Sequence, residues 1–302
     1  MCVKPHFLRS RGEMFPCGFC VECRAKYASE WALRCVHEAA LHDASCFGTL
    51  TYAKMPERGS LERGALREFM RSLREELAVN VWCSWDPGDG IRHRSCGRMV
   101  RRTVSPVKMY GAGEYGEENG RPHYHFLLFG FAFPDRAVLR GGKYPLFRSP
   151  LLERVWPHGV SSIGDLSYES AAYVARYVMK KVDQVGRKKK YNVDGETGEM
   201  VEIEPEFARM SRGGRTGRGL GYGWFERYGD EVHRNDSIVS GGRELPVPRY
   251  YDKVLSERDR AAFDVMKARR ARKYADKRLN FGELAARELN AVKRLEMLER
   301  SI

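Results

Sequence analysis

Two histidines that are separated by one residue, His123 and His125, have the spacing of metal ligands. On a β-strand, residues two apart project from the same face, so both imidazoles would lie side by side. The Asn119-Gly120 pair predicts a hairpin turn just before them, and Glu114 on the partner strand can then lie beside the histidines. Two imidazoles and one carboxylate bind a divalent metal with coordination positions left open. The alternative is a strand with two polar residues that face water.

Tyr173, Tyr177 and Lys180 follow one another at intervals of four and three residues, which places them on one face of a helix. A metal can polarise a phosphoryl oxygen while a nearby tyrosine attacks the phosphorus, and this forms a covalent phosphotyrosine. Lys180 would then stabilise the tyrosinate or the phosphate. The alternative is that both tyrosines pack in the core while the lysine is solvated.

Three cysteines, Cys17, Cys20 and Cys23, form a C-x2-C-x2-C cluster. Such a cluster can nucleate a Zn²⁺ or iron–sulfur site, although a tetrahedral site needs a fourth ligand. The candidates for that ligand are Cys2, His6, Cys35 and His37. The alternative is three reduced cysteines in a tight turn.

The elements that must position these residues follow from hydrophobic spacing and from turn and cap residues. Helices are predicted over residues 24–42, 61–78, 151–156 and 167–182, and one or two more over residues 256–302. Strands are predicted over residues 46–52, 81–85, 104–110 and 160–166, with the hairpin over residues 114–130. Ser167 or Ser170 is expected to cap the helix that carries the tyrosines.

The chain is strongly basic, with 53 Lys and Arg against 40 Asp and Glu and a net charge of +13 over 302 residues. Such an excess favours a polyanionic partner, although a solvated basic surface is the simpler alternative. The predicted DNA-binding residues are Arg176, Lys181, Arg187, Lys188, Lys189, Lys190, Arg212 and Arg215. Aromatic residues that could stack on bases are Tyr191, Tyr222, Trp224 and Phe225.

The first residues lack an apolar stretch of signal-peptide length, and the longest apolar run, residues 126–133, is too short to cross a bilayer. Eight cysteines without a secretion signal favour thiols or metal ligation over disulfides. We therefore expect a cytoplasmic protein with no membrane segment.

Three segments in this order resemble the motifs of HUH endonucleases: FGTLTY (47–52), GEYGEENGRPHYHFLLFG (113–130) and YVARYVMKK (173–181). More narrowly, PCGFCVECRAKYASEWALRCVHEA (16–39), RPHYHFLLFG (121–130) and MSRGGRTGRGLGYGWFERY (210–228) resemble the rolling-circle replication initiators of the gokushovirus branch of the Microviridae. Two departures are Arg176, where the related motif has lysine, and a segment 211–223 that is richer in glycine and arginine.

The resemblance implies an α+β HUH fold, a central antiparallel sheet flanked by helices, with a Cys-rich N-terminal segment (1–45), the endonuclease domain (46–228) and a basic helical C-terminal extension (229–302). It implies metal-dependent nicking of single-stranded origin DNA with Mg²⁺ or Mn²⁺, a 5′-phosphotyrosine link, a free 3′-hydroxyl and later rejoining. Tyr173 and Tyr177 would be the nucleophiles, Lys180 the helper cation, and His123 and His125 the metal ligands. A host helicase and polymerase would be the partners, in the host cytoplasm.

Four other functions remain open at this point. A plasmid relaxase or an HUH transposase would use the same histidine pair, although such a transposase more often has one tyrosine. A non-haem iron oxygenase uses two histidines and a carboxylate but needs no basic surface. A non-catalytic nucleic-acid-binding protein would bind strands without cutting them.

Overall fold

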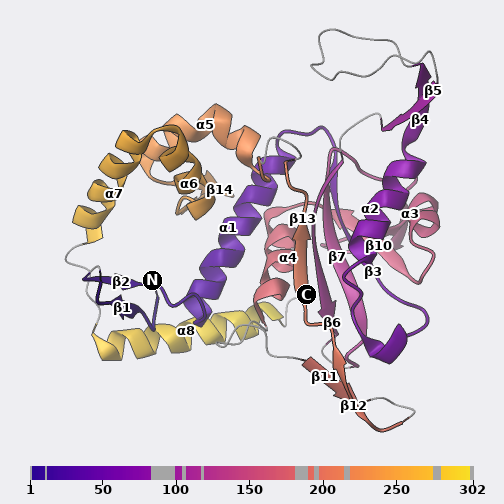
Figure 1. Cartoon of the computed structure of the whole chain (residues 1–302), viewed down its shortest axis with the longest axis horizontal. Coiled ribbons are helices and arrows are strands. Elements are labelled where there is room, and N and C mark those ends of the chain that lie inside the picture. The colour runs from indigo at the N-terminus through magenta and orange to yellow at the C-terminus, as the bar shows by residue number, and fades with distance from the viewer. Residues whose placement is uncertain are drawn as a thin grey trace. The chain divides into compact units, whose positions relative to one another are not determined.

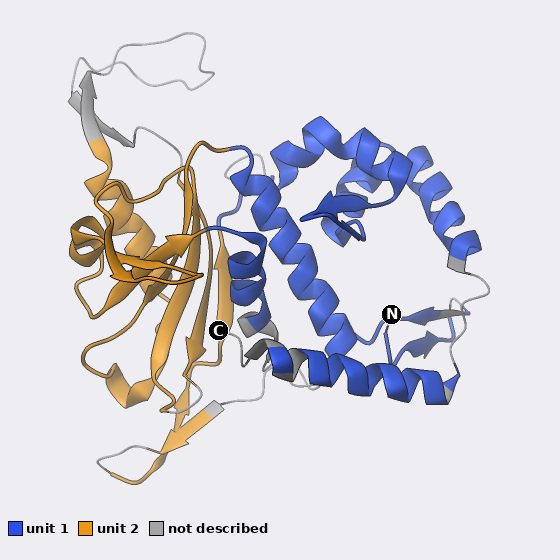
Figure 2. Ribbon diagram, turned by 180° about the vertical axis from the view of Figure 1, so that it is seen from behind, with its two compact units in different colours: residues 1–41, 166–190, 211–302 blue, residues 42–165, 191–210 orange. Residues whose placement is uncertain are grey.

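The computed structural model describes residues 2–10, 12–82, 99–103, 107–116, 119–180, 190–193, 197–213, 218–274 and 280–299. The chain forms two compact units, each assembled from separate stretches of sequence (Figure 2). Unit 1 comprises residues 1–41, 166–190 and 211–302, and unit 2 comprises residues 42–165 and 191–210.

Unit 2 is built on one antiparallel sheet of seven strands in the order β13-β6-β7-β3-β10-β9-β8 (Figure 1). Its strands are β3 (Ser45–Leu50), β6 (Lys108–Tyr115), β7 (Pro122–Phe129), β8 (Ala137–Arg140), β9 (Leu146–Arg148), β10 (Ser161–Asp165) and β13 (Phe207–Met210). Strand β7 pairs with β6 on one side and with β3 on the other, so it is an interior strand.

Two helices, α2 (Ala65–Glu76) and α3 (Pro150–Val155), lie on one face of this sheet (Figure 1). The reason is the alternation along β7, where Tyr124, Phe126 and Leu128 point to one face and form a core with α2 and α3. The apolar side of α2 supplies Leu66, Phe69 and Leu73 to the same core. His123 and His125, at the intervening positions of β7, therefore project from the opposite face.

The smaller elements of unit 2 are a short 3₁₀ helix and two antiparallel pairs of strands. They are η1 (Glu57–Gly59), β4 (Ala78–Trp82) with β5 (Met99–Thr103), and β11 (Lys190–Val193) with β12 (Met200–Ile203).

Unit 1 is mostly helical. Its helices are α1 (Val21–Ala39), α4 (Tyr168–Lys180), α5 (Tyr222–Asn235), α6 (Arg249–Arg258), α7 (Arg260–Tyr274) and α8 (Phe281–Glu299). Two small hairpins complete it, β1 (His6–Leu8) with β2 (Glu13–Phe15) and β14 (Ile238–Ser240) with β15 (Arg243–Leu245).

Helix α1 packs against α4, and a hydrogen bond of 3.0 Å joins Ser29 Oγ to Tyr168 Oη. A second core gathers Leu33, Phe225 and Tyr251 from α1, α5 and α6. Phe225 is buried there, so the prediction that its ring is available for base stacking is wrong. Trp224 is also engaged, because its ring stacks on that of His37 at a centroid distance of 3.5 Å.

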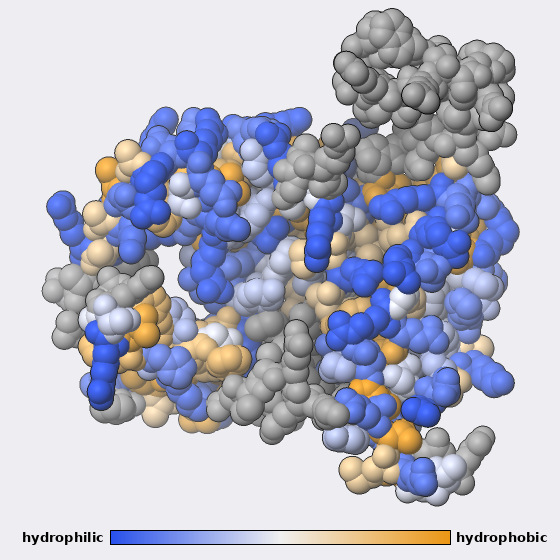
Figure 3. Space-filling view, in the orientation of Figure 1, coloured by the Kyte–Doolittle hydropathy of each residue, from blue (hydrophilic) through white to orange (hydrophobic). Residues whose placement is uncertain are grey.

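The predicted α+β class with a large antiparallel sheet is confirmed. The predicted helices and strands are present within a few residues of their expected bounds, although residues 104–106 of one strand lie outside the described residues. Hydrophilic side chains predominate on the face drawn in Figure 3. Searched over the residues that the structure describes, none of the helices combines the length and apolarity needed to span a membrane.

Candidate metal centre and tyrosine helix

The β6–β7 hairpin places Glu114 directly opposite His123 and places Ala112 opposite His125. Gly116 N–H donates to the carbonyl of Arg121 at 2.9 Å, and Gly120 adopts a φ of 60°, a conformation that glycine reaches at little cost. The predicted Asn-Gly hairpin is therefore confirmed. Glu117 and Glu118, which were expected in the turn, lie outside the described residues.

Glu114 contacts both imidazoles through one oxygen. Its Oε1 lies 2.6 Å from His123 Nε2 and 2.9 Å from His125 Nε2. The two rings are almost perpendicular, with an interplanar angle of 89° and centroids 5.0 Å apart. The structure thus brings together one carboxylate and two imidazoles, and their ligand atoms lie within 4.8 Å of one another.

The remaining ring nitrogens of both histidines have partners of their own. His125 Nδ1 shares a hydrogen bond of 2.9 Å with Thr49 Oγ1, which comes from β3, the other neighbour of β7. His123 Nδ1 lies 3.1 Å from the carbonyl oxygen of Arg121, to which it can donate. Contacts of this kind fix the ring orientation of metal-binding histidines and direct Nε2 toward the ion.

The three groups are buried to different degrees, and their pKa values shift accordingly. Burial opposes ionisation of Glu114, but hydrogen bonds from His123 and His125 outweigh it and lower the pKa of this carboxyl group. Burial also works against the His123 cation, yet the hydrogen bond to Glu114 raises the pKa of His123. At His125 burial dominates and lowers the pKa. The cluster therefore holds a carboxylate anion beside an imidazole that favours the neutral form.

A bound cation fits these residues. Glu114 Oε2 is buried without a hydrogen-bond partner, and an unsatisfied buried carboxylate oxygen is costly. The two Nε2 atoms and the carboxylate supply the mixed nitrogen and oxygen ligands of an open metal site. A divalent ion held by Glu114, His123 and His125 would compensate the buried negative charge.

Helix α4, in unit 1, carries the predicted tyrosines. Ser167 caps it, because Ser170 N–H donates to Ser167 Oγ at 3.2 Å while Ser167 N–H donates to Ser170 Oγ at 2.8 Å. The expectation of a serine cap is confirmed, and Ser167 is the residue that precedes the helix. Tyr173 is partly buried. Tyr177 follows one turn later, and the side chains of Tyr177 and Lys180 lie outside the described part of the structure.

The predicted DNA-binding residues are only partly described. Arg212 is exposed, Arg176 is partly buried on α4, and Lys190 begins β11. The others lie outside the described residues: Lys181, Arg187, Lys188, Lys189 and Arg215.

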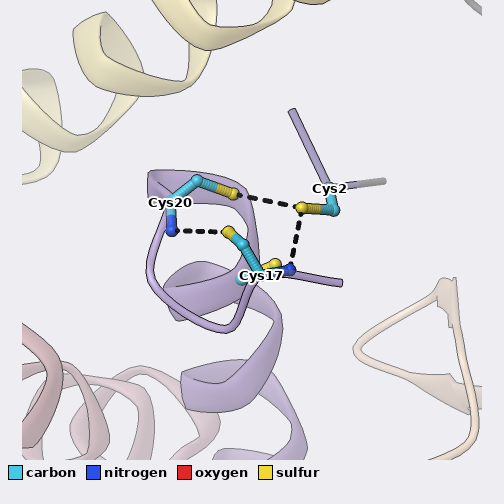
Figure 4. A group of neighbouring side chains, drawn as sticks. Cys2, Cys17 and Cys20 are labelled. Atoms are coloured by element: carbon cyan, nitrogen blue, oxygen red, sulfur yellow. Dashed lines mark hydrogen bonds between the residues drawn. The ribbon is translucent and has the colours of Figure 1, made fainter. Parts of the chain in front are cut away.

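The cysteine cluster gains a fourth member. The sulfurs of Cys2, Cys17, Cys20 and Cys23 lie within 4.8 Å of one another, and Figure 4 shows the side chains of Cys2, Cys17 and Cys20 turned toward each other. The other candidates for the fourth position are placed elsewhere. Cys35 is buried within α1, His37 shares a hydrogen bond with Tyr251 Oη at 2.8 Å, and His6 is exposed on β1.

Comparison with known proteins places this geometry in a family context. Residues 45–182 match a family of replication-associated proteins of the ORF2 type. The replication-associated protein VP4 of Bdellovibrio phage phiMH2K is 29% identical over 78% of this chain and 66% of its own length. The replication-associated protein ORF2 of Spiroplasma virus 4 is 26% identical, over 84% of this chain and 72% of its own length. The chain is a relative of phage replication-associated proteins. The resemblance to the Microviridae-type initiators is therefore confirmed.

A third relative, the replication-associated protein ORF4 of Chlamydia phage 1, is 25% identical over 80% of this chain and 53% of its own length. No solved structure matches the chain significantly. The part of this replication-associated protein that matches the family includes Glu114, both histidines and both tyrosines of α4, whereas the four cysteines precede it.

Sequence reasoning missed two residues of these sites in this replication-associated protein. Thr49 lies in a strand that was predicted, but its contact with His125 depends on the register between β3 and β7, for which the sequence carries no signal. Cys2 was only one of four candidates, because 15 residues separate it from Cys17 and only the fold selects it.

Proposed function

We propose that this chain is a rolling-circle replication initiator with an HUH endonuclease fold, whose endonuclease domain lies within residues 46–228. It would nick single-stranded DNA at a replication origin through a tyrosine and later rejoin the strand. One observation carries the proposal: a buried carboxylate bracketed by two histidines on an interior strand, in a relative of phage replication-associated proteins.

Glu114, His123 and His125 would hold Mg²⁺ or Mn²⁺. When bound, the ion would polarise the scissile phosphate and stabilise the negative charge that develops in the transition state. The protein contributes the orientation of the ligands, since Thr49 and the Arg121 carbonyl hold the outer ring nitrogens.

Tyr173 or Tyr177 would supply the nucleophile. The phenolic oxygen attacks the phosphorus, so that an O–P bond forms to the 5′ side of the break while the bond from phosphorus to the 3′ oxygen breaks. The phenolic proton is lost to solvent, and the departing oxygen is protonated to give a free 3′-hydroxyl. The phosphotyrosine conserves the bond energy, so the reverse attack by a 3′-hydroxyl rejoins the strand.

Basic residues would hold the DNA. Lys180 would stabilise the tyrosinate or the phosphate, and Arg176 and Arg212 would contribute phosphate contacts. The net charge of +13 supports binding that weakens as salt increases. The free 3′-hydroxyl would prime a host polymerase, and a host helicase would open the duplex.

The rival functions make different predictions. A relaxase or transposase shares the chemistry, and the names of the relatives favour replication. A non-haem iron oxygenase would use the same ligand set but would form no DNA adduct. A non-catalytic binding protein would bind DNA in a salt-sensitive way and leave it intact.

The test is formation of a denaturation-resistant adduct. Single-stranded oligonucleotides that tile the DNA encoding the chain are labelled at the 3′ end and incubated with the protein and Mn²⁺ or Mg²⁺. We expect the 3′-labelled fragment to migrate with the protein on a denaturing gel, whereas 5′-labelled DNA is released as a shorter strand that a polymerase can extend.

The variants separate the roles of the residues. Tyr173→Phe/Tyr177→Phe should abolish the adduct, and His123→Ala should lower it by about two orders of magnitude or more, whereas Tyr144→Phe, a change at an exposed tyrosine of unit 2, should leave it unchanged. An undiminished adduct in the double tyrosine variant would refute the proposal. Full activity in a chelator would refute the role of the metal.

A further inference from the structure

Four sulfur atoms converge at the start of α1, in unit 1. Cys2 Sγ lies 3.8 Å from Cys20 Sγ, and all four sulfurs lie within 4.8 Å of one another. Thiolates around one tetrahedral Zn²⁺ stand about 3.8 Å apart, because each Zn–S bond is about 2.3 Å long. The spacing of the cluster is close to that of a single-ion site.

Backbone N–H groups point at these sulfurs. Cys17 N–H donates to Cys2 Sγ at 3.2 Å, and the N–H groups of Phe19 and Cys20 donate to Cys17 Sγ at 3.4 and 3.2 Å. Cys20 is also the residue that precedes α1, where the helix dipole favours negative charge. Both features stabilise the thiolate form, which is the form that binds metal.

The N-terminal segment has little apolar burial to hold it in place. Of the described residues from 2 to 20, Val3 is the sole buried aliphatic residue, and Phe7, Leu8 and Met14 on the first hairpin are exposed. A segment with so small a core usually needs a cross-link or a metal to hold one conformation. The cysteines are the groups in this segment that can supply it.

Two other uses of four cysteines fit the structure less well. All four thiols are free, and a disulfide would require sulfurs at about 2 Å. An iron–sulfur cluster places several iron and sulfide atoms among its thiolates, so its ligand sulfurs stand further apart than those around one ion. A single soft, tetrahedral cation suits the cluster best.

We propose that Cys2, Cys17, Cys20 and Cys23 bind one Zn²⁺ as a closed structural site. The ion fastens the residues around Cys2 and the first hairpin to the beginning of α1, the helix that packs against α4. With four protein ligands no coordination position remains for substrate, so the site stabilises the fold and takes no part in chemistry. The proposal is independent of the nuclease assignment.

The test uses the full chain, purified without chelators and under reducing conditions. Elemental analysis should find one zinc per chain. After exchange for Co²⁺, the protein should show the near-ultraviolet charge-transfer band that thiolate ligands give. Any Co²⁺ at Glu114, His123 and His125 has only nitrogen and oxygen ligands and adds nothing to this band.

The variants locate the site. Cys20→Ala should lose the bound zinc and the charge-transfer band, whereas Cys35→Ala, a buried cysteine of the same helix outside the cluster, should keep both. Cys2→Ser changes a residue outside any helix and should weaken Co²⁺ binding by a factor of about ten or more. Should Cys20→Ala not fold, treating the wild-type chain with a mercurial thiol reagent should release one zinc.

Three results would overturn the proposal. They are a reduced, folded chain that contains no zinc and gives no thiolate band with Co²⁺, a Cys20→Ala variant that keeps its zinc, and a chain that contains iron with acid-labile sulfide. Because none of these readouts involves DNA, each is distinguishable from a failure of the nuclease proposal.

Discussion

Glu114 depends on its neighbours at both ends of the two imidazoles it contacts. Its Oε1 is shared by the two Nε2 atoms while its Oε2 has no protein partner, and the Nδ1 atoms are held by Thr49 and by the Arg121 carbonyl. A metal ligand set therefore includes residues that do not themselves touch the ion.

The contact of Thr49 with His125 gives a direct test of this idea. Thr49→Val removes the hydroxyl but keeps the branched shape, so His125 loses the partner that orients its ring. We expect Mn²⁺ affinity, measured by calorimetry, to fall by about 10- to 100-fold. Thr49→Ser keeps the hydroxyl and should bind Mn²⁺ almost as tightly as the wild type. Equal affinity in Thr49→Val would show that Thr49 does not support the site.

A second buried histidine makes stability depend on pH. Burial lowers the pKa of His37 to about 4, against an ordinary value near 6.5. As pH falls from 6.5 to 4 the unfolded chain takes up a proton at this residue and the folded chain does not, so stability decreases. Above pH 6.5 the full stability is present. The loss approaches about 3 kcal/mol across this window.

The variant His37→Asn isolates this effect. Asparagine can still share a hydrogen bond with Tyr251, but it does not titrate. The free energy of unfolding, measured by denaturant titration between about pH 7 and pH 4, should fall less steeply for the variant than for the wild type. Identical slopes would show that His37 is not the group responsible, even if the variant is less stable at every pH.

The catalytic side chains could be predicted because they rest on short-range geometry. His123 and His125 share a face through the two-residue period of a strand, and an Asn-Gly turn brings Glu114 opposite them. Cys2 and Thr49 could not be selected, because their contacts depend on how distant segments pair.

At the scale of elements, the beginning of α4 determines where the tyrosines lie. Ser167 and Ser170 exchange hydrogen bonds with each other's backbone N–H groups, which satisfies two donors at the helix terminus. This reciprocal cap fixes the residue at which the helix begins, and with it the rotation of Tyr173 about the helix axis.

Removing the cap should destabilise unit 1. Ser167→Ala leaves Ser170 N–H without its acceptor, and we expect a loss of about 1 kcal/mol in the free energy of unfolding. Ser167→Asp preserves a capping oxygen and places a negative charge at the helix N-terminus, so its stability should match the wild type or exceed it. Thermal and denaturant unfolding of the three proteins would decide. A stable Ser167→Ala would contradict the capping role.

Some elements could not be predicted from local patterns. Helix α5 contains Gly223 and Gly229 and begins after Gly221, and glycine lowers helix propensity by about 1 kcal/mol per residue. The structure explains one of them, because a Cβ on Gly229 would lie 2.8 Å from the ring of Phe225. Strand β13 is only four residues long, and it joins the sheet through pairing with β6.

At the scale of the whole molecule, chain order and spatial order differ. Unit 1 gathers α1, α4 and the C-terminal helices from three separate stretches, while unit 2 holds the sheet and the histidines. Local periodicity contains no information about such assembly. The proposed reaction needs groups from both units, since the metal ligands belong to unit 2 and the tyrosines to unit 1.

The account depends most on a tyrosine of α4 becoming joined to DNA, and peptide mapping of the adduct tests this directly. The adduct formed with Mn²⁺ is trimmed with nucleases, digested with a protease and analysed by tandem mass spectrometry. We predict that the nucleotide remnant lies on Tyr173 or Tyr177 and disappears in His123→Ala. A remnant on any other residue, or none on intact protein that binds the DNA, would contradict the account.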